Sequence, residues 1–448
     1  MIPVNRAFLR QIIIVSGAFA LLWFCWDSHS RTLFNGLASP LFFALAAYMS
    51  FLATQYEIAV SKTPLFLFLL FSMWAVFADA RSGEFLPALA VDTHWFVLPI
   101  AVLLFSKALR EFPQQISLAL RIGATLCIIN ILLTMYFNAE WYDNWRLPPI
   151  FGHFRHMGLS IGFMTILLCS GDESRGILPG LFRIARILGI AIVIWTGSRA
   201  AVLAWIIAFP FFIYSNRKLA VTLIVDTVIA AALAQIPAPP SPNLAGVTLI
   251  KRTLLSSPAS GNLLSGRIGL WESTLAGLDG IRRLWNGLGG NGFARLQVMH
   301  EAAVKPWGHV HAHSFIVQGI CDWGIIGMAF LGCFFLRSTL MPILAGWRRN
   351  DPMALSGIIY IVFTGMFDAT LYHLEHLVYL AFALAWLFSR KAPPRQTFPA
   401  IQPESSGAPA PLLAIPGILT IALLAGFAAI HFFSSGYRIG LGWYFPTQ

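Results

Sequence analysis

Residues 314–336 read SFIVQGICDWGIIGMAFLGCFFL, a run in which Asp322 is the only charged residue. A helix that crosses a bilayer needs about 20 mostly apolar residues, so this run predicts a membrane span. The composition extends that prediction to the whole chain, because 57% of its 448 residues are hydrophobic and only 11% are charged. Soluble domains are about 45–50% apolar and about 25% charged, and disordered chains are more polar still. The sequence therefore predicts an all-α integral membrane protein.

Similar apolar runs predict 12–13 transmembrane helices. The count stays open between those numbers because the last two runs before the C-terminal Pro-rich linker are closely spaced. The first run lacks a small-residue cleavage site, so we expect a retained anchor and not a signal peptide. The candidate spans lie near 8–26, 39–55, 64–80, 87–106, 116–137, 156–170, 183–197, 199–214, 218–237, 314–336, 353–368, 371–389 and 411–433.

The distribution of Lys and Arg predicts the orientation of these spans. With the N-terminus in the cytoplasm, most cations of the short loops fall on the cytoplasmic side, as the positive-inside rule requires. The net charge of +11 is then a loop bias, and we expect no nucleic-acid partner. This topology divides the chain into N-terminal spans (1–237), a long outer loop (238–313) and C-terminal spans (314–448). Within the loop, helical spacing predicts short helices at 265–285 and 291–304.

Two polar clusters lie at the predicted outer ends of spans, where ionisable groups are candidates for function. In the first, Ser198 and Arg199 occupy a tight turn between two apolar runs. Arg199 is either a snorkelling residue that marks the interface or an anion anchor at a helix start. We favour the anchor because cations are otherwise scarce on that side. In the second cluster, Arg155 and His156 lie between glycines. They are either ordinary loop residues or a second cation for the anion that Arg199 would bind.

A third cluster, Trp307-Gly-His-Val-His-Ala-His-Ser314, precedes the span quoted above. Three histidines at alternate positions could form a zinc site, but the loop offers few carboxylates for a second shell. A buried or interfacial histidine is the plain alternative. The third interpretation is that His313 acts as a general base, since imidazole titrates near neutrality.

The residues after His313 carry a more specific pattern. His313-Ser314 is followed by nine residues and then by Gly324-Ile-Ile-Gly327. Two glycines three apart in a helix allow close approach of a neighbouring helix. This signature resembles that of the bacterial O-antigen ligases, which are related to O-antigen polymerases and pilin oligosaccharyltransferases. The dozen spans, the long loop before the signature, the Ser198-Arg199-Ala200 turn and a Gly266-Arg267 element in the loop extend the resemblance.

The resemblance implies a fold of the glycosyltransferase C type and an enzyme of the bacterial inner membrane with its active site at the periplasmic face. It implies transfer of a glycan from undecaprenyl pyrophosphate to a sugar hydroxyl of lipid A–core, without metal or other cofactor. By position, His313, Arg199 and Arg267 match the family's catalytic residues. We predict that further residues bind substrate, namely Arg155, His156, His311, Ser314 and Ser198.

The chemistry of the residues agrees with this assignment. A departing pyrophosphate needs positive charge, and the sequence has no Asp-x-Asp pair to hold a divalent cation. Arginine must supply the charge, and its planar fork suits phosphate oxygens. We therefore expect direct displacement at the anomeric carbon with inversion. In this mechanism His313 orients or deprotonates the acceptor hydroxyl and His311 supports His313, while Arg199 and Arg267 hold the departing pyrophosphate.

Three rival functions remain open at this stage. An O-antigen polymerase or a pilin oligosaccharyltransferase would use the same donor with another acceptor. A secondary transporter would need ionisable residues deep within spans and two matching halves. The acids at apparent span depth are few, and no matching halves are evident. They are Asp92, Asp226, Asp322 and Asp368.

Overall fold

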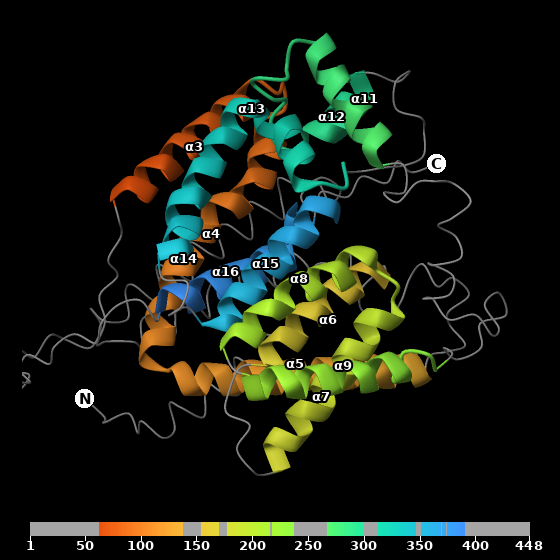
Figure 1. Ribbon diagram of the computed structural model, residues 1–448. Coiled ribbons are helices and arrows are strands. Elements are labelled where there is room, and N and C mark those ends of the chain that lie inside the picture. The colour runs from red at the N-terminus through yellow and green to blue at the C-terminus, as the bar shows by residue number, and fades with distance from the viewer. Residues whose placement is uncertain are drawn as a thin grey trace, which may run out of the picture.

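The computed structural model describes residues 62–137, 154–169, 177–215, 217–236, 267–299, 312–345, 351–368, 370–372 and 374–389. Every regular element in these ranges is a helix, which confirms the all-α prediction for this part of the chain (Figure 1). The expected spans at 8–26, 39–55 and 411–433 lie outside the described residues, so the total of 12 or 13 stays a prediction. The elements are α3 (Lys62–Ala80), α4 (Phe85–Glu111), α5 (Pro113–Phe137), α6 (Phe154–Leu168), α7 (Ile177–Trp195), α8 (Arg199–Ser215), α9 (Arg217–Leu233), α11 (Arg267–Gly280), α12 (Gly292–Met299), α13 (Phe315–Phe335), the π-helix η3 (Leu336–Leu340), α14 (Met341–Ala345), α15 (Pro352–Asp368), the 3₁₀ turn η5 (Thr370–Tyr372) and α16 (Leu374–Ser389).

Five of the described helical segments are long and apolar enough to cross a membrane, and they include α3, α4, α7 and the run from Phe315 to Leu340. Helix α3 shows why these helices suit lipid. It buries Phe71 and Ala75 against the bundle and leaves Leu69, Met73 and Phe77 exposed. A helix that is apolar on both its inner and outer faces is stable only where the surroundings are apolar as well. The prediction of a multi-span membrane protein is therefore confirmed.

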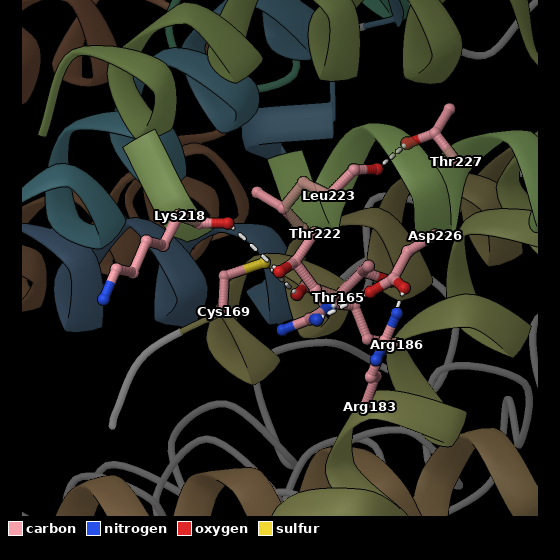
Figure 2. Close-up of polar contacts among 9 residues, drawn as sticks. All are labelled: Thr165, Cys169, Arg183, Arg186, Lys218, Thr222, Leu223, Asp226 and Thr227. Carbon is pink, nitrogen blue, oxygen red and sulfur yellow. Dashed lines mark hydrogen bonds and ion pairs between the residues drawn. The ribbon is translucent and has the colours of Figure 1, made fainter. Parts of the chain in front are cut away.

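A buried ion cluster joins α7 to α9 (Figure 2). The carboxylate of Asp226 accepts a hydrogen bond from Nε of Arg183 at 2.9 Å. It also accepts hydrogen bonds from Nε and Nη2 of Arg186, at 3.0 and 2.6 Å. The side chains of Asp226 and Arg186 are 0% and 3% exposed, so this pair lies inside the bundle. Asp226 therefore ties α7 and α9 together.

Helix α13 is not continuous, which corrects the interpretation of its two glycines. Gly324 has φ 69° and ψ 179°, so the helix breaks there. A Cβ at Gly324 would overlap the carbonyl oxygen of Trp285, because the loop between α11 and α12 enters the break. Gly327 alone plays the expected role, since a Cβ there would lie 2.8 Å from Cδ1 of Trp74 on α3.

The loop between α11 and α12 is fixed to the spans by backbone hydrogen bonds. Leu288 and Gly289 donate to the carbonyl oxygens of Cys321 and Asp322 at 2.7 and 2.8 Å, next to the break in α13. Gly290 N–H donates to the Asp79 carboxylate at 2.8 Å. Both short helices of the loop were expected, and the structure has α11 and α12 within the expected ranges. Residues 265–266 and 300–304 of those ranges lie outside the described residues. Figure 1 shows α11 and α12 at one end of the bundle, so the loop is a docked cap in its described part.

Candidate active site

Asp368, the last residue of α15, brings two of the predicted catalytic residues together. Its Oδ1 lies 3.1 Å from Nδ1 of His313 and 3.2 Å from Nη2 of Arg267. These residues come from three separate segments, and their side chains are 4%, 19% and 14% exposed for Asp368, His313 and Arg267. The resulting cluster is nearly buried, yet each of its members keeps some contact with solvent.

Local structure explains how each side chain reaches this point. Arg267 is the first residue of α11, and it also donates to the carbonyl oxygen of Phe367 at the end of α15. A cation at a helix C-terminus satisfies the last carbonyl groups and interacts favourably with the helix dipole. His313 lies two residues before α13 and has φ 51°, a left-handed backbone conformation that is rare for a residue other than glycine. The strain marks His313 as a position that its surroundings hold in place.

Arg199, the third predicted catalytic residue, lies at the same end of the bundle on a neighbouring helix. Helices α8 and α15 pack side by side, and Ser356 of α15 donates to the carbonyl oxygen of Ala208 on α8 at 3.1 Å. Four residues further along α15, Tyr360 donates to the carbonyl oxygen of Gly158 on α6. A Cβ at Gly158 would lie 2.7 Å from Oγ1 of Thr196, at the turn that begins α8.

This register makes α8 and α15 antiparallel. Asp368 follows Tyr360 by eight residues, which is about 12 Å of helix at 1.5 Å per residue. Asp368 therefore lies beyond the level of the Thr196 turn, and exposed Arg199 begins the adjacent helix at that end. All three predicted catalytic residues thus lie at one end of the bundle, and two of them, His313 and Arg267, contact the same oxygen of Asp368.

The structure describes some of the predicted substrate-binding residues but not all of them. The ring of His156, on α6, lies 6.4 Å from the ring of His376 on α16 in an edge-to-face arrangement. Ser198 and Ser314 are described but buried, each at 4% exposure. The side chain of Arg155 and the whole of His311 lie outside the described residues, so their roles stay predictions.

Two residues of the site were missed by sequence reasoning about function. Asp368 was noted only as an acid at span depth, and His376 was not considered. His376 is 1% exposed and follows Asp368 through the short turn η5. An aromatic contact fixes this turn, since Tyr372 stacks on Trp323 with centroids 6.2 Å apart.

The residues around Asp368 suit the binding of an anion. Within the described ranges, no group of three His, Cys, Asp or Glu side chains is arranged to hold a metal ion. His309 and His311, the other members of the suggested zinc site, lie outside those ranges. Asp368 is engaged by an imidazole and a guanidinium, an arrangement that can orient a base and attract phosphate oxygens.

These features define a helical membrane protein with a polar, cation-rich site at one end of its bundle. A comparison with protein families gives a more specific assignment, because the family model described as O-antigen ligase matches residues 184–332. The match spans α7 to α13 and includes Arg199, Arg267 and His313. The match supports the resemblance to the O-antigen ligases over this segment of the chain. A comparison with curated proteins found no match.

The family assignment supports a function of the ligase, polymerase or oligosaccharyltransferase type. Members of the family are glycosyltransferase-like enzymes that act on lipid-linked glycans. Asp368 and His156 lie outside the matched segment. The part of Asp368 in the site follows from the structure alone, whereas His156 was also predicted from the sequence.

Proposed function

We propose that the chain is an O-antigen ligase, a metal-independent inverting glycosyltransferase of the bacterial inner membrane. It transfers a glycan from undecaprenyl pyrophosphate to a sugar hydroxyl of lipid A–core at the periplasmic face. The observation that carries this proposal is the single carboxylate of Asp368, which contacts both His313 and Arg267. One group thereby links the candidate base to a candidate anion ligand.

The contact with Asp368 assigns the two nitrogens of His313. A carboxylate accepts hydrogen bonds, so Nδ1 of His313 carries the proton and donates to Asp368. Nε2 is then the basic nitrogen and takes the proton from the acceptor hydroxyl. Asp368 holds the ring and stabilises the imidazolium that forms, as a carboxylate does in a catalytic triad. The same residues therefore supply both orientation and charge compensation.

The bond changes are those of a direct displacement. The acceptor oxygen forms a bond to the anomeric carbon while the bond from that carbon to the phosphate oxygen breaks. The electron pair of the broken bond leaves with undecaprenyl pyrophosphate, and the acceptor proton passes to His313. Arg199 and Arg267 carry two positive charges against the one negative charge of Asp368, which favours the departing diphosphate. Attack from the opposite face inverts the anomeric configuration.

The experiment replaces Arg199, Arg267 and His313 by Ala one at a time and follows glycan transfer in proteoliposomes. Loss of a preorganised donor costs about 3–4 kcal/mol, so each variant should be slower by a factor of roughly 10²–10³. Arg81→Ala serves as the matched control, because Arg81 is exposed and its guanidinium lies over the ring of Phe77, 5.4 Å from the ring centroid. Near-normal transfer by any of the three variants would remove that residue from the mechanism.

A second arm tests the acceptor and the independence from metal. Core-only lipopolysaccharide, lipid-linked repeat units and pilin are offered in parallel to the purified protein. Transfer to the core alone supports a ligase, and transfer to either other acceptor replaces it by a polymerase or an oligosaccharyltransferase. The activity should be unchanged in EDTA, and a loss that added Zn²⁺ or Mg²⁺ restores would contradict the metal-independent mechanism.

A further inference from the structure

The backbone around His313 is fixed on both sides. Before His313, Ala312 is fully buried; its N–H donates to Oε1 of Gln318 at 3.1 Å and its carbonyl accepts Nε1 of Trp271 at 2.8 Å. After His313, the carbonyl oxygen of Ser314 accepts the N–H of Gln318 at 2.9 Å. The backbone of Ala312 and the carbonyl group of Ser314, on either side of the strained residue, thus have fixed orientations.

Gln318 is itself held by a second set of contacts. Its Nε2 donates to Oδ1 of Asp322 at 3.2 Å, and the same oxygen accepts the N–H of Gly292 at 2.6 Å. Gln318 and Asp322 are 3% and 0% exposed, so water does not compete for these bonds. The chain of hydrogen bonds runs from the docked loop through Asp322 and Gln318 to the residue before His313.

Trp271 links the same peptide to the other half of the site. It lies one turn after Arg267 on α11, so both side chains project from one face of that helix. Through Arg267, α11 contacts Asp368, and through Trp271 it contacts the peptide that precedes His313. A shift of α11 would therefore move Arg267 and the backbone of His313 together.

We propose that Gln318 and Trp271 are positioning residues, which hold His313 in its left-handed conformation so that the imidazole meets Asp368. This inference rests on the proposed role of His313 as the base. Strained conformations persist where the surroundings over-determine them, and three hydrogen bonds to the backbone of Ala312 and Ser314 meet that condition. Without these contacts, His313 relaxes toward an ordinary backbone conformation and its ring leaves Asp368.

The test uses two conservative substitutions, Trp271→Phe and Gln318→Met, which keep most of the side-chain volume and remove the hydrogen bonds. We expect kcat for glycan transfer to fall by a factor of about 10–100 in each variant, while KM for both substrates stays within twofold. The matched controls are Trp285→Phe and Gln235→Met, because both side chains are exposed. Both controls should retain the wild-type kcat.

A second readout does not depend on activity. Hydrogen exchange at the amide of Ala312 should be faster in Gln318→Met, and the rate of His313 modification by diethylpyrocarbonate should change in both variants. Unchanged exchange together with a kcat within twofold of wild type would overturn the inference. An equal loss of kcat in the controls would also overturn it. If the wild-type protein transfers no glycan but the variants still show altered exchange, the proposed function is refuted. The positioning of His313 by Gln318 and Trp271 then still stands.

Discussion

Replacement of Asp368 by Asn tests the central feature of the site, because it removes a charge and changes almost no volume. In the structure, Oδ1 of Asp368 accepts from both His313 and Arg267. The amide oxygen of Asn can occupy the same position, so both contacts can persist as weaker, neutral-acceptor bonds. The substitution therefore isolates the contribution of the negative charge.

The magnitude follows from the two bonds affected. Hydrogen bonds to a charged group contribute about 1.5–3 kcal/mol, against about 0.5–1.5 kcal/mol for neutral pairs. The loss of charge at both bonds therefore costs on the order of 3 kcal/mol. Only the part that grows as the imidazolium forms slows the reaction, so we expect kcat to fall by a factor of roughly 10–10². Asp368→Ala removes the acceptor as well and should lose at least as much activity.

The assay is glycan transfer in proteoliposomes, with Asp351→Asn as the matched control. Asp351 caps the opposite end of the same helix, where its Oδ1 accepts the N–H of Met353 at 2.9 Å, and Asn is an equally good cap. A second measurement combines Asp368→Asn with His313→Ala. Residues that act as one unit are not additive, so the double variant should be no slower than His313→Ala alone. A folded Asp368→Asn protein with kcat within threefold of wild type would refute the reasoning.

Two further predictions concern the scaffold. Asp226→Asn should lower the free energy of unfolding by about 3–5 kcal/mol, because it leaves the buried guanidinium of Arg186 without its carboxylate. Thermal unfolding in detergent measures this loss, and an unchanged melting midpoint would contradict the prediction. Gly324→Ala should give little folded protein, since Gly324 has φ 69° and a Cβ would meet the Trp285 backbone. The control is Gly332→Ala on the same helix, which has open space for its Cβ and should fold normally. Size-exclusion chromatography of the two variants separates these outcomes, and equal yields would contradict the role of Gly324.

The sequence predicted the helices well because lipid imposes a simple requirement on them. A span must be apolar over about 20 residues, and this property is local in the chain. The expected runs at 64–80 and 314–336 therefore agree closely with α3 and α13. The signature around His313 was equally readable, because its residues are close together in sequence. Both successes depend on short stretches of chain.

The partner of His313 could not be predicted in the same way. Asp368 lies 55 residues beyond His313 and 101 beyond Arg267, and only the packing of α15 brings the three together. In an apolar span, the hydrophobic pattern does not fix which face meets which neighbour, so it does not set this register. An acid at span depth was visible in the sequence, but its function depends on a contact that periodicity does not encode.

The break in α13 gives the spacing of the signature a physical meaning. The nine residues from Phe315 to Trp323 form a helical segment of about 13 Å between the site and the point where the loop docks. Gln318 and Asp322 lie one turn apart on this segment and face the loop at Gly292. An inserted residue would rotate this face by about 100° and separate the loop contact from the His313 contact. The distance between His313 and Gly324 is therefore set by two groups of hydrogen bonds that must be made at the same time.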